Sequence, residues 1–311
     1  MREIKNIMIA GAGTMGSSMG ETFAKYGYDV VLYDIFPQAL EKAKNLIALN
    51  QQTEVSEGIV TQEESDKLLS RIQYSSDVNC FSNADFVVEA ILEKLDIKHK
   101  FWEEVSSIVP EDAVLCSNTS GLSITKIAEV VKNPERFAGM HWINPPHIIP
   151  LIEVIKGEKT TEENAKVVYD LAIKVEKKPV IVKDAPGFVL NRIQFAIMRE
   201  CLHIAEQGIA STEGIDDVMK YGLGLRYACL GPFQVADLGG LDIFHNISSY
   251  LFADLCNADD SFGLLKECFD NNHYGVKNGA GFYDYSEGKD EEAIKYRDMM
   301  FTKLSKCLYD K

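Results

Sequence analysis

A histidine and a glutamate flank a proline-rich turn near the middle of the chain. His141 ends an apolar run over residues 137–141, Glu153 interrupts the apolar run 151–155, and Asn144-Pro145-Pro146 between them predicts a sharp reversal. Two strands joined by such a turn would pair and bring the imidazole and the carboxylate together. A carboxylate beside an imidazole fixes its tautomer and stabilises the imidazolium, which suits a general base that takes the proton of an alcohol.

Two further polar side chains lie in apolar surroundings. Ser120 belongs to Ser117-Asn118-Thr119-Ser120-Gly121, which follows a buried strand at the carboxyl end, where ligands bind in open α/β sheets. Asn191 lies near the start of a later helix and would reach back toward a cleft. Each residue alone also has a structural explanation, such as a helix cap or an edge pair. Together the four residues predict a catalytic site.

A glycine-rich turn near the amino terminus predicts a dinucleotide site. An apolar run over 4–10 meets Gly11-Ala12-Gly13-Thr14-Met15-Gly16, and a helical segment and a second apolar run ending in Asp34 follow. This strand–turn–helix–strand context distinguishes a nucleotide site from a glycine turn that binds nothing. Gly11 permits the tight turn, Gly13 leaves room for the pyrophosphate, and Gly16 lets helix and strand pack closely.

Two features of this segment specify the cofactor. The backbone N–H groups at the start of the helix, around Thr14 and Met15, would face the phosphates. Asp34 lies where a carboxylate accepts hydrogen bonds from ribose hydroxyls, and it would repel a 2′-phosphate. The sequence therefore predicts NAD rather than NADP.

The elements that must position these residues change in character along the chain. Residues 1–183 alternate short apolar runs with longer amphipathic ones, which predicts a Rossmann-like, doubly wound and mostly parallel sheet with helices on both faces. After Asp184-Ala185-Pro186-Gly187 the strand runs cease. We therefore expect an all-α carboxyl-terminal domain over 184–311, with helices over 188–207, 212–221, 232–256, 261–271 and 291–308.

Composition excludes several classes of partner and site. The net charge of −15, from 32 basic and 47 acidic residues, argues against nucleic acid and anionic membranes as partners. Seven dispersed cysteines without a CxxC pair indicate reduced thiols rather than a disulfide framework or a metal site. No apolar run approaches the ~20 residues of a membrane-spanning helix, and no signal peptide opens the chain. We expect a cytoplasmic protein.

Seven motifs in order resemble the 3-hydroxyacyl-CoA dehydrogenase family: GAGTMG, VVEAILE, SNTSGLSI, RFAGMHWINPPHIIPLIEVI, DAPGFVLNR, LGPFQVADLGGLD and GAGFYDY. The resemblance covers nearly the whole chain, from about residue 4 to 285. It implies an NAD-dependent oxidoreductase of fatty acid metabolism whose helical second domain forms a homodimer, with the active site in a cleft between the domains.

The resemblance also implies roles for individual residues. His141 would be the catalytic base or acid for hydride transfer between substrate C3 and the nicotinamide, oriented by Glu153, while Ser120 and Asn191 hold the substrate oxygens. The cofactor contacts that it implies are Gly11, Gly13, Gly16 and Asp34, with Glu93, Lys98 and Asn144 around the nicotinamide ribose and Lys277 before GAGFYDY.

Two departures from the family pattern leave the substrate open. Members that use coenzyme A carry lysines in the segment after the second strand, whereas here residues 46–66 are acidic. Arg226-Tyr227 replaces a small apolar turn and resembles the gulonate and carnitine dehydrogenases, whose substrates are free hydroxy acids. Arg226 would then bind a carboxylate through two hydrogen bonds, unless it is a surface or dimer-contact arginine. The substrate is thus a short-chain 3-hydroxyacyl-CoA, as in 3-hydroxybutyryl-CoA dehydrogenase, or a small free hydroxy acid. A non-catalytic protein on the same scaffold, like the crystallins of this superfamily, is a third alternative.

Overall fold

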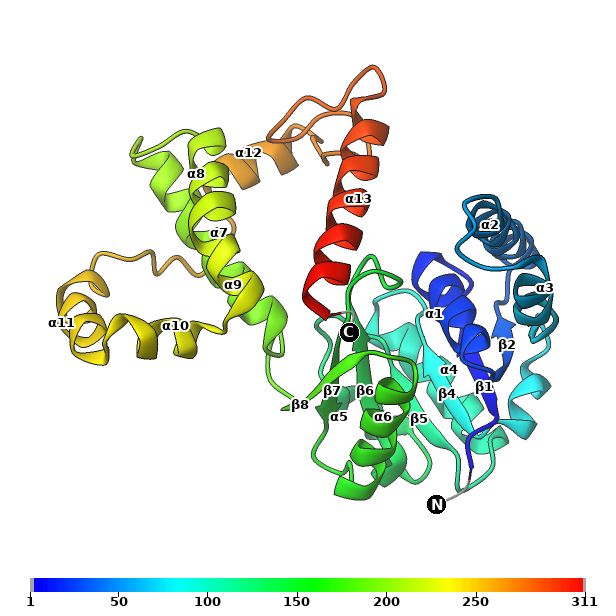
Figure 1. Ribbon diagram of the computed structural model, residues 1–311. Coiled ribbons are helices and arrows are strands. Elements are labelled where there is room, and N and C mark those ends of the chain that lie inside the picture. The colour runs from blue at the N-terminus through cyan, green and yellow to red at the C-terminus, as the bar shows by residue number, and fades with distance from the viewer. Residues whose placement is uncertain (1–2, 310–311) are drawn as a thin grey trace. The chain divides into compact units, whose positions relative to one another are not determined.

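The computed structural model describes residues 3–309 (Figure 1). The chain forms two compact units, residues 1–191 and 192–311. The boundary predicted from the sequence lies earlier, between residues 183 and 184, and stays a prediction. Among the described residues, no helix is long and apolar enough to cross a membrane.

The first unit is built on an eight-stranded sheet in the order β3-β2-β1-β4-β5-β6-β7-β8. The pair β6–β7 is antiparallel and every other neighbouring pair is parallel. This arrangement confirms the predicted doubly wound, mostly parallel sheet. The strands are β1 Asn6–Ala10, β2 Asp29–Tyr33, β3 Ile72–Ser75, β4 Phe86–Glu89, β5 Val114–Ser117, β6 Phe137–Trp142, β7 Leu151–Lys156 and β8 Lys178–Lys183.

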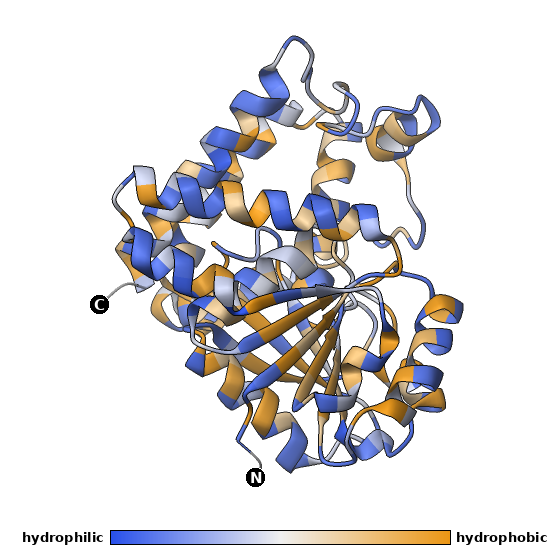
Figure 2. Cartoon of the chain, turned by 90° about the vertical axis from the view of Figure 1, so that its right-hand side faces the viewer, coloured by the Kyte–Doolittle hydropathy of each residue, from blue (hydrophilic) through white to orange (hydrophobic). Residues whose placement is uncertain are grey.

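Helices cover both faces of this sheet, and apolar clusters fill the space on each side. All residues of β4, β5 and β6 are buried, which is why these strands are nearly continuous apolar runs rather than alternating ones. Figure 2 shows the strands as a mainly hydrophobic layer. The helices are α1 Thr14–Lys25, α2 Pro37–Ser56, α3 Gln62–Ser70, α4 Leu95–Ile108, α5 Ile124–Ile127 and α6 Glu162–Lys174, with 3₁₀ turns at Val78–Asn83, Ala128–Val130 and Pro134–Arg136.

The second unit is helical, apart from isolated bridges between residues 275 and 284. Its helices are α7 Leu190–Glu206, which begins at the end of the first unit, α8 Thr212–Val218, α9 Leu225–Cys229, α10 Pro232–Gly239, α11 Leu241–Leu251, α12 Gly263–Asp270 and α13 Lys289–Tyr309. A π-helical segment, Met219–Gly224, joins α8 to α9. The all-α expectation for this region is thereby confirmed.

One prediction for the second unit was wrong. The sequence predicted a single helix over 232–256, but α10 and α11 are separate helices that meet at Gly240. The backbone of Gly240 has φ of +94°, a conformation that a helix cannot contain and that glycine adopts without a side-chain clash. The apolar periodicity of the segment continued across this break and concealed it.

Burial differs sharply between the two units. The first unit contains a large set of fully buried side chains, whereas in residues 192–309 only Leu202 is buried. Helices α10 and α11, which we call the arm, expose large apolar side chains along their length, including Phe233 at 87% and Leu238 at 77%. In Figure 1 the arm extends from α9 within the second unit.

Candidate active site

The glycine turn between β1 and α1 has the geometry that its sequence predicts. Gly11 has φ of +101°, and a Cβ atom there would lie 2.5 Å from the Ala90 carbonyl oxygen. A Cβ atom on Gly16 would lie 1.8 Å from the Gly11 carbonyl oxygen. Both positions therefore require glycine for packing, because real Cβ atoms do not approach backbone so closely. A Cβ atom on Gly13 would instead project into open space.

This open space at Gly13 lies at the start of α1, where backbone N–H groups lack helical partners. No side chain caps α1, and its first turn contains no acidic residue. The helix start around Thr14 and Met15 thus offers free N–H groups and a positive dipole end to an anion. These features fit the pyrophosphate of a dinucleotide, whose approach a side chain at position 13 would obstruct.

Asp34 closes the turn from the end of β2. Its carboxylate accepts hydrogen bonds from the backbone N–H of Ala12 at 2.9 Å and of Phe36 at 2.9 Å. Each oxygen retains a lone pair, because a carboxylate has about four acceptor sites. Asp34 is therefore held in place beside the glycine turn and can still accept from a ribose hydroxyl.

A buried charge cluster lies at the carboxyl end of β4. Lys98, on α4, is fully buried and its ammonium contacts the carboxylates of Glu89 and Glu93. Glu89 is also fully buried, and it accepts hydrogen bonds from the Ser117 hydroxyl and the Trp102 indole as well. This number of donors balances the cost of burying a carboxylate and fixes the ends of β4 and β5 relative to α4.

The cluster extends into the loop that carries Ser120. The Glu93 carboxylate accepts hydrogen bonds from the Thr119 hydroxyl and from the Ser120 backbone N–H. Burial alone would raise the pKa of Glu93, but Thr119, Lys98 and the Ser120 N–H outweigh it and hold the pKa below its usual range. Glu93 thus stays ionised and orders the loop. The Asn191 amide donates to the Ser120 carbonyl oxygen at 2.7 Å from the other side.

His141 and Glu153 face each other across the antiparallel pair β6–β7. They are register partners, and His141 Nδ1 lies 2.9 Å from Glu153 Oε2. The exposed fractions are 4% for His141 and 2% for Glu153. With Nδ1 occupied by the carboxylate, the tautomer that donates from Nδ1 leaves the lone pair on Nε2 for another proton.

The second oxygen of Glu153 is bound as well. Oε1 accepts from the backbone N–H of Val189 at 3.0 Å and of Leu190 at 2.9 Å, at the start of α7. Burial alone would raise the pKa of Glu153, but the hydrogen bonds from His141, Leu190 and Val189 outweigh it and hold the pKa below its usual range. Glu153 therefore remains a carboxylate and orients the imidazole firmly.

The structure brings most of the predicted site residues to one edge of the sheet. Gly11, Glu93, Ser120 and His141 follow or end the parallel strands β1, β4, β5 and β6, which are consecutive neighbours, so they lie at their carboxyl ends. The Trp142 backbone N–H donates to the Asn118 side chain at 2.8 Å, which joins the Ser120 loop to the strand of His141.

Four predicted residues lie in other surroundings. Lys98 has no solvent-exposed surface, so it supports Glu93 from beneath. Lys277 and Arg226 belong to the second unit, where both are exposed and neither forms an ion pair with the described residues. Their proposed contacts with cofactor and substrate stay predictions. Asn144 is exposed and precedes Pro145 through a cis peptide bond.

Sequence reasoning missed Glu89 and Thr119, which hold this edge together. Glu89 interrupts an apolar strand in the same way as Glu153, and that signal was available. Thr119 is fully buried within the Ser120 loop, and nothing in its sequence context separates it from an ordinary helix-capping residue.

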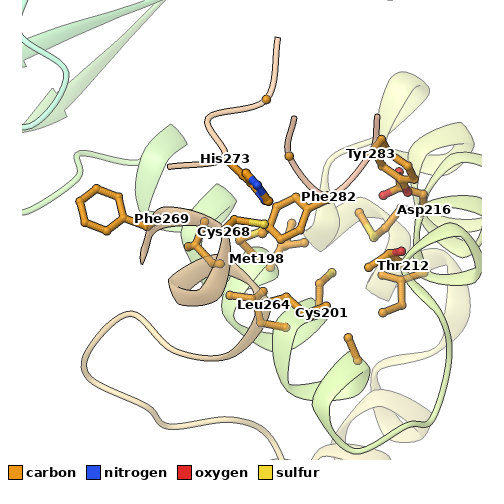
Figure 3. Close-up of a pocket in the computed structure, with 18 of the residues that line it drawn as sticks. Met198, Cys201, Thr212, Asp216, Leu264, Cys268, Phe269, His273, Phe282 and Tyr283 are labelled. Carbon is orange, nitrogen blue, oxygen red and sulfur yellow. The ribbon is translucent and has the colours of Figure 1, made fainter. Parts of the chain in front are cut away.

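The second unit contains an apolar cavity of about 800 Å³. Helices α7, α8 and α12 and the segment 273–285 form its walls, and Met198, Cys201, Leu264 and Phe282 point into it (Figure 3). The Tyr283 hydroxyl donates to Asp216 at 2.9 Å, so two of the few polar groups in the wall satisfy each other. The remaining surface is predominantly apolar.

Known proteins resemble the chain along most of its length. The family profile described as 3-hydroxyacyl-CoA dehydrogenase, NAD binding domain, matches residues 6–185, and the profile described as 3-hydroxyacyl-CoA dehydrogenase, C-terminal domain, matches residues 187–285. A 5-formyl-3-hydroxy-2-methylpyridine 4-carboxylate 5-dehydrogenase of Mesorhizobium japonicum is 37% identical over 285 residues, which are 91% of this chain and 91% of that protein.

Two further relatives represent the two kinds of substrate. A probable 3-hydroxybutyryl-CoA dehydrogenase of Bacillus subtilis is 38% identical over 288 residues, which are 92% of this chain and 99% of that protein. The crystal structure of a 5-formyl-3-hydroxy-2-methylpyridine 4-carboxylic acid 5-dehydrogenase, an NAD⁺-dependent dismutase, has a TM-score of 0.91 at 34% identity. The alignment covers 99% of this chain and 100% of the dismutase chain.

Proposed function

Since the chain belongs to the 3-hydroxyacyl-CoA dehydrogenase family and is an NAD-dependent oxidoreductase that acts on a CH–OH group, we propose that His141 is its catalytic base. One observation carries this proposal: His141 Nδ1 lies 2.9 Å from a buried carboxylate that is itself bound by two backbone N–H groups. A base oriented in this way accepts a proton at one defined atom, Nε2.

In the proposed reaction the substrate hydroxyl gives its proton to His141 Nε2. Glu153 stabilises the imidazolium that forms, because its carboxylate stays ionised and accepts a hydrogen bond from the Nδ1–H group throughout. In the reverse direction the imidazolium returns the proton to the carbonyl oxygen of the substrate. Ser120 and Asn191 hold that oxygen, and the hydrogen bond from Asn191 to the Ser120 carbonyl oxygen keeps the two residues together. Bound NAD would accept or supply the hydride.

We propose that the cofactor lies along the edge from the glycine turn to the Ser120 loop. Gly13, Thr14, Met15 and Gly16 would hold its pyrophosphate, with Gly11 shaping the turn and Asp34 binding a ribose. Glu93 and Asn144 would contact the nicotinamide ribose, and Lys98 would act through Glu93. Lys277 would be a further cofactor contact. The free N–H groups of α1 and the open space at Gly13 support the pyrophosphate position.

For the substrate, we propose a small molecule with a free carboxylate rather than a coenzyme A thioester. Arg226 is exposed on α9, directly after a π-helical segment of a kind that often marks functional sites. Residues 46–66, from the end of α2 into α3, contain five carboxylates and no lysine, whereas the family resemblance implies lysines in this region of members that bind coenzyme A. Lys42, Lys44 and Lys67 flank this acidic surface. Phosphates approaching that surface would meet like charge within the screening distance of roughly 8 Å.

A short-chain 3-hydroxyacyl-CoA remains the second candidate. It is favoured by 38% identity to the probable 3-hydroxybutyryl-CoA dehydrogenase and by the complete set of Ser120, His141, Glu153 and Asn191. A place in fatty acid metabolism belongs to this candidate. That complete set also argues against a non-catalytic role for the protein.

The experiment that separates the candidates follows NADH absorbance with acetoacetyl-CoA and, separately, with free acids. The acids include acetoacetate and 5-formyl-3-hydroxy-2-methylpyridine 4-carboxylate, which is assayed in the direction of NAD⁺ reduction. We expect kcat/KM of ~10⁴ M⁻¹s⁻¹ or more with a free acid and little turnover of the thioester. Turnover of the thioester at that level, with no activity on the acids, would contradict the proposal.

The Arg226→Ala variant tests whether Arg226 binds the carboxylate of the substrate. Loss of a charge-assisted pair should raise KM for the acid roughly 10- to 100-fold, while KM for NAD stays unchanged. Lys220→Ala, which removes another exposed cation six positions earlier, in the adjoining π-helical segment, is the matched control. An equal rise in KM in both variants would mean that Arg226 attracts the acid only through its positive charge and does not bind the carboxylate specifically.

We also propose that the protein is a homodimer in which the arm of one copy packs into the cavity of the other. In residues 192–309 only Leu202 is buried, so the helices of the second unit lack the core that a stable domain needs. The arm and the cavity belong to the same unit, and two copies related by a twofold axis would cover both pairs at once.

The areas involved fit a permanent interface. Covering the exposed apolar side chains of one arm would remove roughly 800 Å² from water. The surface that each arm covers on the other copy would lose a similar area. Two arms and two covered surfaces would therefore bury about 3,000 Å² in total, within the range of obligate dimers. Sedimentation velocity should show a dimer at every concentration at which the protein is folded. We further propose a reducing, cytoplasmic location, which fits seven cysteines that are all free thiols.

A further inference from the structure

A buried lysine that the proposed reaction does not use lies beneath the connection between β6 and β7. Lys177 precedes β8 and is only 7% exposed. Its ammonium donates to the carbonyl oxygens of Pro146 at 2.6 Å and Ile149 at 2.9 Å, and it lies 5.2 Å from the centre of the Trp142 ring. No carboxylate among residues 3–309 forms an ion pair with it. A buried cation without a counter-ion is costly, so its retention requires a reason.

The reason lies in the segment that Lys177 contacts. The connection over residues 143–150 contains three prolines, at positions 145, 146 and 150, and therefore has few N–H donors. The N–H groups of Ile148 and Ile149 both donate to Pro145, which leaves the carbonyl groups of Pro146 and Ile149 to be satisfied from elsewhere. Lys177 supplies donors to both.

This connection joins the strands of the two residues that form the proton-accepting pair. It begins two residues after His141 and ends three residues before Glu153, and it carries Asn144, the proposed cofactor contact. The third partner of the ammonium, Trp142, is the neighbour of His141 on β6. Each contact of Lys177 therefore falls on the connection itself or beside the catalytic histidine.

We propose that Lys177 is a positioning residue that fixes the 143–150 connection, and through it Asn144 and the end of β6, for cofactor binding. It does not touch the reacting atoms. Two directional hydrogen bonds and the cation–π contact define one geometry for a segment that cannot hold itself by backbone hydrogen bonds. The effect on cofactor binding rests on the proposed role of Asn144, whereas the contact with Trp142 can be tested without it.

The surroundings make the charge of Lys177 sensitive to pH. Burial, together with repulsion from Lys25 at the end of α1, lowers the pKa of Lys177 to about 8. The neighbouring Glu176 forms no ion pair with Lys177 among the described residues, and its carboxylate accepts instead from the Tyr26 hydroxyl at 2.7 Å. Exposed Lys178 and exposed His147 are the other titratable side chains on the adjoining segments. The ammonium thus begins to lose its proton within an accessible pH range.

Trp142 fluorescence tests the contact directly. Trp102→Phe leaves Trp142 as the single tryptophan, because the chain has only two. In this background the emission of Trp142 should change through a transition near pH 8 as Lys177 deprotonates. Lys177→Met should abolish the transition, and Lys177→Arg should also abolish it by keeping the cation throughout. A transition that persists in Lys177→Met would overturn the assignment.

Steady-state kinetics of the full-length protein test the positioning role. Lys177→Met should raise KM for NAD about tenfold with a smaller change in kcat, since the connection is displaced while His141 remains paired. Lys177→Arg should restore KM, and the exposed neighbour variant Lys178→Met should leave it unchanged. In the wild type KM for NAD should rise above pH 8, and in Lys177→Arg it should not.

Each unfavourable result has a distinct meaning. Loss of melting temperature in Lys177→Met without any change in KM would reduce Lys177 to a structural residue and overturn its positioning role. A pH-dependent Trp142 signal together with unchanged KM would instead refute the role of Asn144. Neither result depends on which acid or thioester is the substrate.

Discussion

The two units of this chain differ in where their order comes from. In the first unit, buried strands and helices fix the site residues, and even the charged groups Glu89 and Lys98 are fully enclosed and paired. In the second unit only Leu202 is buried among residues 192–309, while Phe233 and Leu238 remain largely exposed. The first unit is therefore organised by its own core, and we propose that the second is organised by another copy.

This difference separates two ways of losing activity. Substitutions among the hydrogen-bonded groups of the first unit should affect cofactor binding or proton transfer without altering assembly. Substitutions on the apolar surface of the second unit should affect assembly and stability first. A variant that violates this division would show that the two units depend on each other more closely than their burial indicates.

The largest expected effect is that of Glu153→Gln on catalysis. The amide would donate to His141 Nδ1, which places the imidazole proton on Nε2 and removes the lone pair that accepts the substrate proton. We expect kcat to fall by about 10⁴-fold, as when the orienting carboxylate of a catalytic histidine is replaced by an amide. Sedimentation should still show the wild-type assembly. A fall of less than tenfold would mean that Glu153 does not orient the base.

The next largest effect is expected for Phe233→Asp in the arm. Phe233 is 87% exposed in the single chain, so a polar residue there would cost nothing in a monomer, and an acid near the start of α10 would suit the helix dipole. If the side chain is buried between copies, the substitution should cost at least about 2 kcal/mol of dimer stability. Sedimentation velocity and thermal melting measure both consequences.

The control for this variant comes from the first unit. Ile59 is 57% exposed and lies in the turn between α2 and α3, where no second copy is proposed to bind. Ile59→Asp should leave the oligomeric state and the melting temperature unchanged. Equal effects of the two substitutions, or no effect of either, would contradict the proposed contrast between the units.

A smaller effect distinguishes two glycines of the cofactor turn. Gly16→Ala should destabilise the first unit, because its Cβ atom would lie 1.8 Å from the Gly11 carbonyl oxygen. Gly13→Ala has open space and should leave the melting temperature unchanged while weakening NAD binding by roughly tenfold, about 1.4 kcal/mol. Calorimetric titration with NADH and thermal melting separate the two. Unchanged NADH affinity in Gly13→Ala would exclude this turn as the pyrophosphate site.

The sequence was most informative where burial is continuous. Strands β4, β5 and β6 are apolar runs enclosed on both faces, the pattern from which the mostly parallel sheet was predicted. The facing arrangement of His141 and Glu153 was also predictable, since a proline turn between two short strands leaves few other pairings. The fold and the facing arrangement of His141 and Glu153 thus followed from local patterns.

Sequence patterns did not predict the contacts that form between residues far apart in the chain. Nothing near Lys177 in the sequence indicates that its ammonium reaches the connection after β6, and nothing near Glu89 reveals its pairing with Lys98. The break at Gly240 was missed because apolar periodicity continued across it. The roles of Arg226 and Lys277 stay predictions, as they depend on a substrate and a cofactor.

The rate of hydride transfer in His141→Asn tests the assignment of His141 as the catalytic base. NADH binding should be unchanged, since the imidazole lies on β6 and the proposed pyrophosphate site lies at the start of α1. Turnover with the best substrate, followed by NADH absorbance, should fall by about 10³-fold, within the range attributed to general acid–base catalysis. Retention of more than a tenth of the wild-type rate, with NADH affinity intact, would contradict the assignment of His141 as the base.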